Sequence, residues 1–230
     1  MNAPPLPSIV ELTDADLAAR AVQGDPRAFE LIMRRHNRLL YRTARSVLKN
    51  DQEAEDAVQE AYFNAWKALG SFRADARLST WLVRIVLNEA LGRLRRRHGN
   101  VVPMEPDDGS GTATMGVSPE ADVNEQPDRQ ASRAEMRRVI EARIDALPEI
   151  FRTVFVLRAV EEYTVDEVAV VLGIPEITVR TRFFRARSLL REGLARDVDH
   201  ALEGAFPFAG ARCDRTVARV LARLAESRQE

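Results

Sequence analysis

The chain has 230 residues, of which 45% are hydrophobic and 30% charged, and its formal net charge is −1. It contains one cysteine, Cys213, and three scattered histidines, which excludes an internal disulfide and any Cys or His cluster with metal-ligand spacing. No stretch approaches the ~20 apolar residues of a membrane span, and the N-terminus lacks the pattern of a secretory signal. We therefore expect a protein of the reducing cytoplasm, without membrane insertion, cofactor or metal.

The small net charge hides three segments of different charge. Residues 20–99 carry 16 cationic and 9 acidic side chains, net +7, whereas residues 100–135 carry 2 and 8, net −6. Residues 136–230 are nearly balanced, yet five arginines fall within 176–191. This segregation favours local basic surfaces for nucleic acid over a uniformly basic protein.

Four helices are expected in the first hundred residues, and each begins at a capping residue, Thr13, Asp25, Asn50 or Ser79. Their expected ranges are 13–24, 26–48, 51–69 and 79–97. Because no strand-like alternation competes with the helical period, residues 13–98 are predicted to form one small all-α domain.

The segment 99–130 interrupts this pattern. It is rich in glycine, proline and acidic residues and contains no aromatic residue, which predicts a flexible acidic linker. Helical periodicity resumes near Ala131, and a second small helical domain is expected over 131–196. Its predicted helices cover 131–146, 148–160, 164–172 and 175–193.

A C-terminal extension, residues 197–230, comes after the second domain. It contains an expected helix over 213–227 with an apolar stripe of Val217, Val220, Leu221 and Leu224. Arg215, Arg219 and Arg223 lie around this stripe. Packing on the second domain and binding of a regulator are both compatible with the pattern. The predicted fold class is thus all-α, with two helical domains, a linker and a helical extension.

The helix over 51–69 has two contrasting faces. Small and apolar residues form a broad core face, and Trp66 lies at its margin. The opposite face carries Asp56, Gln59, Glu60 and Phe63. An outward phenylalanine within a polar rim is typical of a protein-binding surface. The alternative is a second packing surface against the helix over 26–48.

The helix over 79–97 carries a stripe that suits single-stranded DNA. Trp81, Arg84, Asn88 and Arg95 lie on one side, and the preceding loop adds Phe72, Arg73 and Arg77. Guanidinium groups meet phosphates, aromatic rings stack on bases and an amide reads a base edge. The alternative is a core Trp81 with a solvated arginine-rich helix end.

Residues 164–191 have the pattern of a helix-turn-helix. Thr164 and Glu167 match a capping box, Gly173 makes the turn and Pro175 begins the second helix. That helix turns polar and basic residues outward, as a recognition helix requires: Thr178, Arg180, Thr181, Arg182, Phe184, Arg185 and Arg187. The alternative is an ordinary helical hairpin with a basic exposed side.

No catalytic set emerges from the sequence. It lacks a glycine-rich phosphate loop, a Gly-x-Ser-x-Gly motif and a defensible His/Asp/Glu group, so no enzymatic activity is expected. The acids at the start of the helix over 51–69 lack EF-hand spacing and indicate a solvated helix start rather than a metal site. Cys213 is interpreted as a small, partly buried residue.

Taken in series, these segments resemble the extracytoplasmic-function group of sigma factors in the sigma-70 family. Residues 54–66 (AEDAVQEAYFNAW) are similar to the family's region 2.2, and 71–88 are similar to regions 2.3 and 2.4. Ala146-Leu147-Pro148, residues 165–169 and residues 178–187 are similar to region 4. Thr181 departs mildly from the serine that is frequent in the family.

The resemblance implies a factor that binds core RNA polymerase through its β′ clamp and β subunit and directs it to promoters. Asp56, Gln59, Glu60 and Phe63 would dock on the clamp coiled coil. Phe72, the adjoining loop and Asn88 would hold a flipped base of the −10 element on the non-template strand. The helix over 175–191 would enter the −35 duplex. An anti-sigma partner is also implied.

Two other functions remain open from the residues alone. An autonomous helix-turn-helix regulator would bind duplex operators without polymerase. An interaction or decoy protein of the sigma system would open no promoter even with core enzyme.

Overall fold

Within residues 12–72, 77–99, 127–203 and 210–226, which a computed structural model describes, every regular element is helical. The first group contains α1 (Asp14–Val22), α2 (Pro26–Leu48), α3 (Asp51–Ala68), the 3-10 turn η2 (Leu69–Ser71) and α4 (Leu78–Gly99). The second contains α5 (Pro127–Asp145), α6 (Glu149–Phe155), the π-helical turn η3 (Val156–Val160), α7 (Val165–Leu172), α8 (Glu176–Glu203) and α9 (Ala211–Glu226). The predicted all-α class is confirmed.

Side-chain caps fix where several of these helices begin. Thr13 and Asp16 form a reciprocal capping box at α1, and the Asp25 carboxylate accepts from the backbone N–H of Arg27 at 3.0 Å. Asn50 caps α3 by accepting from the N–H of Glu53 at 2.9 Å. Each cap satisfies N–H groups that have no partner within the helix, so the expected starts agree with the structure.

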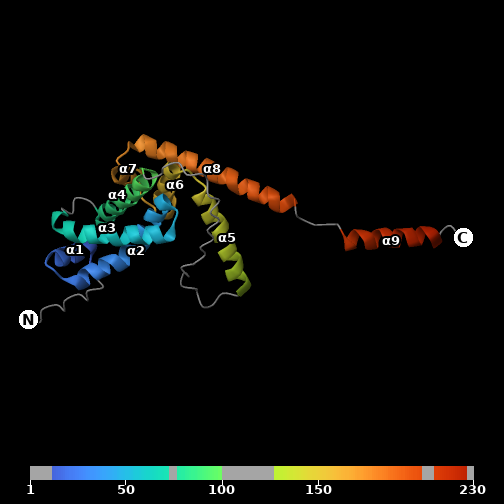
Figure 1. The fold of residues 1–230 in the computed structure, drawn as a ribbon, viewed down its shortest axis with the longest axis horizontal. Coiled ribbons are helices and arrows are strands. Elements are labelled where there is room, and N and C mark those ends of the chain that lie inside the picture. The colour runs from blue at the N-terminus through green and yellow to red at the C-terminus, as the bar shows by residue number, and fades with distance from the viewer. Residues whose placement is uncertain (1–11, 73–76, 100–126, 204–209, 227–230) are drawn as a thin grey trace, which may run out of the picture. The chain divides into compact units, whose positions relative to one another are not determined.

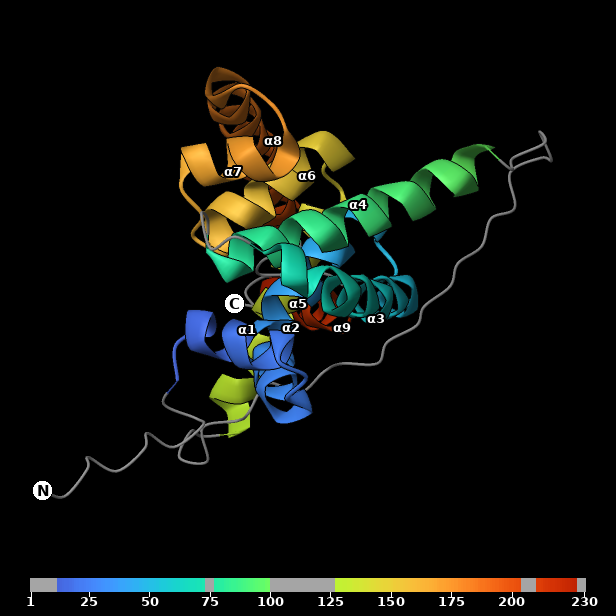
Figure 2. The same ribbon diagram turned by 90° about the vertical axis from the view of Figure 1, so that its left-hand side faces the viewer.

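Helices α2, α3 and α4 pack together around a shared apolar core, and α1 covers one side of α2 (Figure 2). Ile32 and Leu40 of α2 and Leu82 of α4 are fully buried there. The packing face of α3 is dominated by alanines, which lets its backbone approach α2 closely. Phe29 contributes edge-to-face contacts with Tyr62 and Trp66.

The second helical group packs against the first. Helix α6 contacts α2. Helix α7 contacts α4, and Figure 2 shows these two helices side by side. Val154, Leu157 and Val168 belong to the same buried cluster as the residues of α2 and α4. Both predicted helical domains are thus present, and they pack into one compact unit that extends to Leu190.

Two helices exceed their expected ranges. Helix α5 begins at Pro127, four residues inside the predicted linker, because proline suits the first position of a helix. Helix α8 continues through Gly193 to Glu203, ten residues beyond its expected end. A single glycine within a helix costs only about 1 kcal/mol, so it need not end one. The rest of the predicted linker, residues 100–126, lies outside the described residues.

The second unit comprises residues 191–230 and includes the end of α8 and helix α9 (Figure 1). In α9, Val217, Val220 and Leu221 are exposed along one stripe, with Arg215 and Arg219 also exposed. Cys213 is partly buried. Among the described helices, none is long and apolar enough to cross a membrane.

Candidate nucleic-acid and protein-binding surfaces

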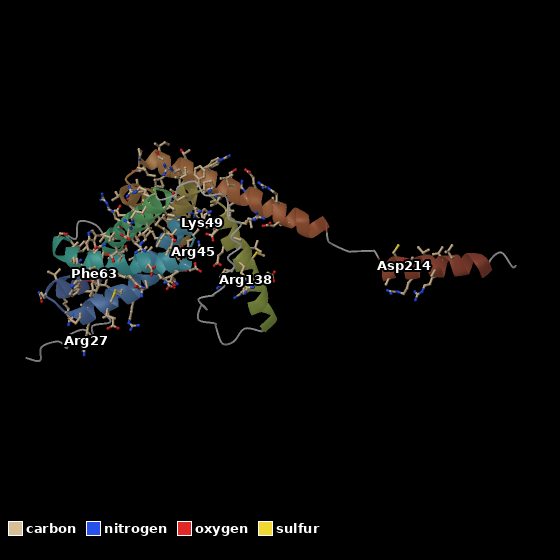
Figure 3. The ribbon with its side chains drawn as sticks, in the orientation of Figure 1. Arg27, Arg45, Lys49, Phe63, Arg138 and Asp214 are labelled. Carbon is tan, nitrogen blue, oxygen red and sulfur yellow. The ribbon has the colours of Figure 1, made fainter. Side chains whose placement is uncertain are left out.

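The outward face of α3 presents an aromatic side chain among polar groups. Phe63 is 55% exposed, and Gln59 and Glu60 are also exposed (Figure 3). The ammonium nitrogen of Lys67 lies 3.8 Å from the centre of the Phe63 ring, a cation–π contact. Asp56 is half-buried and accepts from the Gln52 amide at 3.3 Å. The alternative of a second packing surface is wrong for Phe63, because α3 packs on α2 through its alanine face.

Trp66 marks the edge of this surface. It is 39% exposed, and its ring meets Phe29 edge-to-face with centroids 4.9 Å apart. The contact anchors the C-terminal half of α3 on α2. An exposed aromatic ring on a rigid helix next to charged groups can bury its face in a partner without reorganising the bundle.

A second surface runs along α4. Arg84, Asn88 and Arg95 are exposed on one side of the helix, in the stripe that the sequence predicted. Trp81 is partly buried and packs against Phe72, with ring centroids 5.4 Å apart and tilted by 47°. Both rings also contact the bundle core. Trp81 therefore combines the two predicted environments, packing on the core while one part stays accessible.

The loop before α4 is described only in part. Residues 73–76 lie outside the described residues, and the predicted contact Arg73 is among them. The Arg77 side chain is 79% exposed, and its guanidinium lies 3.2 Å from a carboxylate oxygen of Glu167 on α7. The structure thus brings a predicted DNA-contacting arginine beside an acid of the second helical group.

The predicted helix-turn-helix is formed by α7 and α8. Thr164 and Glu167 make the expected capping box, with the Thr164 N–H donating to the Glu167 carboxylate at 2.9 Å. Gly173 ends α7 with φ +64°, a left-handed conformation that glycine adopts without strain. The N–H of Ile174 then donates to the carbonyl of Ala169 at 3.1 Å. The chain turns here as the sequence predicted.

Helix α8 separates a buried face from a basic outer face. Val179 and Ala186 are fully buried, and Phe183 stacks on Phe155 of α6 with centroids 6.2 Å apart. Phe184 is 76% exposed on the outer side. Of the other predicted contacts, four are exposed and two are partly buried: Arg180, Thr181, Arg185 and Arg187, then Thr178 and Arg182. An exposed phenylalanine among arginines suits a groove that offers thymine methyls and phosphates.

Sequence reasoning missed a set of buried contacts between the two helical groups. Arg152 of α6 is 1% exposed, and its guanidinium donates to backbone carbonyls of Ser46 and Val47 at the end of α2. It also donates to the carbonyls of Asp145 and Leu147, before α6. Removal from water lowers the pKa of Arg152. No sequence pattern predicts these contacts of Arg152, because the acceptors are backbone carbonyls, which every residue has.

Two arginines of α2 also form ion pairs with acids of the second helical group. Arg45 donates twice to the Asp145 carboxylate, at 3.0 and 2.7 Å, and also pairs with Asp51 at 2.6 Å. Burial alone would lower the pKa of Arg45, but the hydrogen bonds to these two carboxylates raise it overall. Arg42 pairs with Glu161 at 3.1 Å. Figure 3 labels Arg45 near the C-terminal end of α2.

Within the described residues, no group of three or more His, Cys, Asp or Glu side chains is placed to hold a metal ion. Two of the acids at the start of α3 form ion pairs: Asp51 with Arg45, and Glu53 with Arg97 at 3.7 Å.

Two family models match this chain. Residues 32–99 match the family model of Sigma-70 region 2, and residues 137–190 match that of Sigma-70 region 4. The first match contains the exposed faces of α3 and α4. The second contains Arg152 and the helix-turn-helix.

Several curated proteins are similar over most of their length. The RNA polymerase sigma-H factor of Pseudomonas aeruginosa is 35% identical over 185 residues, which is 79% of this chain and 93% of that protein. The ECF RNA polymerase sigma factor SigM of Mycobacterium tuberculosis is 36% identical, with 78% and 84% covered. The ECF RNA polymerase sigma-E factor of Escherichia coli is 33% identical, with 78% and 93% covered.

Solved structures show the same fold. CnrH, determined in complex with the cytosolic domain of CnrY, matches with a TM-score of 0.57 and 30% identity over 80% of this chain and 98% of that one. The Bartonella quintana sigma factor RpoE, determined with the anti-sigma factor NepR, matches with a TM-score of 0.55 and 24% identity over 73% and 96%.

Proposed function

This chain belongs to the sigma-70 family as an alternative sigma factor of the extracytoplasmic-function group, and from that premise we propose how its surfaces divide the work of promoter recognition. Residues 13–98 act as region 2, 131–196 as region 4, 99–130 as the linker and 197–230 as an extension. The observation that carries the proposal is that three exposed surfaces, on α3, α4 and α8, occur in the order of the family's binding regions.

The α3 face is the proposed dock for the β′ clamp of core RNA polymerase. Its anchor is Phe63, and Asp56, Gln59 and Glu60 supply the polar rim. Burial of an exposed aromatic side chain contributes about 1.5–3 kcal/mol, and peripheral polar groups exclude water and set orientation. Contact with the β subunit is proposed for the second half of the chain.

The proposed −10 surface combines α4 with the loop before it. Phe72 and Trp81 offer aromatic faces, Asn88 offers an amide for a base edge, and the arginines of this surface offer phosphate contacts: Arg73, Arg77, Arg84 and Arg95. Extruding one base from a duplex costs a few kcal/mol, which stacking and edge contacts offset once the strand is single. The surface therefore favours the melted non-template strand over duplex DNA.

The proposed −35 surface is the outer face of α8. The helix enters the major groove of duplex DNA, where Phe184 contacts thymine methyl groups and the arginines bridge to phosphates or guanine. The residues assigned to this contact are Thr178, Arg180, Thr181, Arg182, Phe184, Arg185 and Arg187. No chemistry is assigned to the chain itself, so it acts as a dissociable, non-enzymatic subunit in the bacterial cytoplasm.

An anti-sigma partner completes the proposal. The similar protein CnrH was solved with the cytosolic domain of a second protein, which supports regulation of this chain by a bound protein. We expect such a partner to cover the α3 face and the end of α4.

Reconstitution tests the function directly. Purified protein is mixed with bacterial core RNA polymerase and genomic promoter fragments, and transcription starts are mapped. Discrete starts that share two spaced upstream elements are expected. Binding to duplex DNA without polymerase and without discrete starts would instead indicate an autonomous regulator. Polymerase binding without promoter opening would indicate a decoy.

A further inference from the structure

The C-terminal extension carries none of the contacts that the proposed function names, since the last of those residues is Arg187. The extension nevertheless contains a well-defined helix, α9 (Figure 1). We infer that α9 binds reversibly to the surface of an anionic lipid bilayer, with its apolar side in the interface and its arginines at the headgroups. The inference rests on the residues of α9 and does not depend on the proposed function.

The apolar side of α9 is open to solvent. Val217 and Val220 are each 52% exposed, and Leu221 is 60% exposed. At about 100° per residue, these three positions occupy about a third of the helix circumference. Aliphatic side chains exposed at successive turns form a continuous apolar surface, which gains free energy when it leaves water for an apolar environment.

The opposite side of α9 is cationic. Arg215 and Arg219 are exposed, and the helical period of the sequence assigns Arg212 and Arg223 to the same side. The helix contains four arginines and two acids in all. One of the acids, Asp214, lies in the first turn, where the helix dipole favours a negative charge (Figure 3). The cations are therefore concentrated on one face.

This division of residues is typical of a helix that lies in the plane of a membrane interface. Such a helix combines low overall hydrophobicity with one apolar face and one face rich in lysine or arginine. The aliphatic stem of an arginine can cover apolar surface while its guanidinium reaches a headgroup phosphate. The exposed arginines of α9 thus complement the charge of an anionic bilayer.

The composition of the apolar side limits how strongly it inserts. Valine, leucine and alanine supply this side, and α9 contains no aromatic residue. Insertion alone therefore holds the helix weakly, and attraction between arginines and anionic headgroups must add to it. Binding should require anionic lipid and weaken with salt, because the Debye length is only ~8 Å at physiological ionic strength.

A second copy of the chain fits α9 less well than a bilayer does. A helix of 16 residues is about 24 Å long and about 10 Å wide, so its footprint is roughly 240 Å². Stable protein interfaces bury about 600 Å² or more on each partner. Pairing of two α9 helices through their apolar sides would also leave the arginines without a role.

Flotation of the full chain with lipid vesicles tests the inference. One set of vesicles contains phosphatidylglycerol and phosphatidylcholine, and the other contains phosphatidylcholine alone. Wild-type protein should float with the anionic vesicles, remain behind with the neutral ones, and be released from the anionic vesicles by high salt.

A matched pair of charge variants separates α9 from the other basic surfaces. Arg215→Gln with Arg219→Gln should lower the partition coefficient about 30-fold, because each cation near an anionic surface is worth about fivefold. Arg137→Gln with Arg138→Gln removes the same charge from exposed positions of α5 and should change it less than twofold.

A second matched pair tests the apolar side. Leu221→Gln should lower the partition coefficient about tenfold, because a polar side chain then enters the interface. Val198→Gln makes a similar change on α8, where Val198 is 57% exposed, and should have little effect. These positions are exposed, so the substitutions should leave the folded unit up to Leu190 intact.

The depth of α9 can be measured through Cys213. It is the only cysteine of the chain, so a fluorophore on its thiol reports on α9 alone. Nitroxide groups on the lipid acyl chains should quench this fluorophore in anionic vesicles, because the apolar face of an interfacial helix lies about 5–10 Å deep.

Three results would each overturn the inference. The first is that wild-type protein does not float with anionic vesicles. The second is an equal loss of binding in the α5 and α9 charge variants, which would indicate general attraction of a cationic surface. The third is a fluorophore at Cys213 that responds to protein concentration but not to vesicles, which would indicate a second copy of the chain instead.

Discussion

At the residue scale, Phe63 is an aromatic side chain whose exposure to solvent is not explained by packing of the core. It is more than half exposed, whereas Tyr62 on the same helix is buried and Trp66 packs in part on Phe29. Lys67 lies over its ring and holds one face away from water. The same exposure that makes Phe63 dispensable for the core makes it available to a partner.

Phe63→Ala should therefore weaken binding to core RNA polymerase without changing the stability of the chain. A buried interface anchor is worth about 2 kcal/mol or more, so the Kd for core enzyme should rise ~30-fold. Fluorescence anisotropy with labelled core enzyme measures the change, and urea denaturation measures stability. Val22→Ala, at a similarly exposed position of α1, serves as the control. Unchanged affinity in Phe63→Ala would contradict the clamp assignment.

Glu162 is a second residue set apart by its environment. It lies just after the π-helical turn η3 and has φ +56°, a left-handed conformation that costs a residue with a Cβ atom about 1–2 kcal/mol. Its neighbour Glu161 makes the ion pair with Arg42, so this strained position lies where region 4 meets α2.

Glu162→Gly should raise the free energy of unfolding by about 0.5–1 kcal/mol, because glycine removes the strain but gains freedom in the unfolded chain. Urea denaturation of the full chain measures the difference. Glu162→Ala keeps the Cβ atom and should give no such gain. Equal stability of the glycine and alanine variants would show that the backbone strain is not the cause.

Exposed functional residues and buried ones differ in how far the sequence predicts them. Phe63 and Phe184 stand out on helical wheels because each is an aromatic residue on a polar face. Arg152 does not, since an arginine after Leu147-Pro148 reads as an ordinary polar position of a helix. Its role depends on carbonyl groups more than a hundred residues away, and those carry no side-chain signature.

At the element scale, local chemistry determines the helix starts better than it determines the helix ends. Thr13, Asp25, Asn50 and Thr164 each place a side-chain oxygen on free N–H groups, so the starts are predictable to within about a residue. The end of α8 depends on the residues after Gly193, and propensity alone does not decide it. For the same reason the π-helical turn after α6 has no counterpart in the predicted helix over 148–160.

The cap of α7 can be tested by removing one oxygen. Thr164→Ala eliminates the acceptor for the Glu167 N–H and should lower the free energy of unfolding by about 1 kcal/mol. Thr164→Ser retains a hydroxyl and should keep most of that stability. Urea denaturation of both variants provides the measurement. If the serine variant lost as much as the alanine variant, the β-methyl packing rather than the cap would be responsible.

On the outer face of α8, a charged residue and an aromatic residue should affect the salt dependence of DNA binding differently. Arg185→Gln removes one exposed cation, so affinity for a cognate promoter should fall and the slope of log affinity against log salt should decrease by about one phosphate contact. Phe184→Ala should lower affinity without altering that slope, because the phenyl ring carries no charge. Salt titrations of the polymerase-bound factor distinguish the two. Identical slopes for the arginine variant and the wild type would remove Arg185 from the phosphate contacts.

At the scale of the whole molecule, the packing of region 4 on region 2 is the feature that is hardest to predict from sequence patterns. The helical content, the order of the surfaces and the acidic intervening segment all favour two separate domains. Three kinds of contact join them: one buried arginine on backbone carbonyls, three ion pairs, and shared apolar packing through Leu157, Tyr163 and Val168. None of these has a fixed spacing along the chain, so only the folded arrangement reveals them.

Thermal unfolding distinguishes two regions that fold as one unit from two regions that fold independently. If residues up to Leu190 fold around one continuous core, heating the full chain should give a single cooperative transition by calorimetry. Asp145→Arg with Glu161→Arg should lower the temperature of this transition, because region 2 and region 4 then lose part of their mutual stabilisation. Glu135→Arg with Glu141→Arg should keep one transition. Arg152→Met should have the largest effect, since three buried carbonyls and one partly buried carbonyl lose their donor, at about 1–3 kcal/mol for each buried one that finds no other. Two transitions in the wild type would mean that the regions fold independently and that their contact adds little to either.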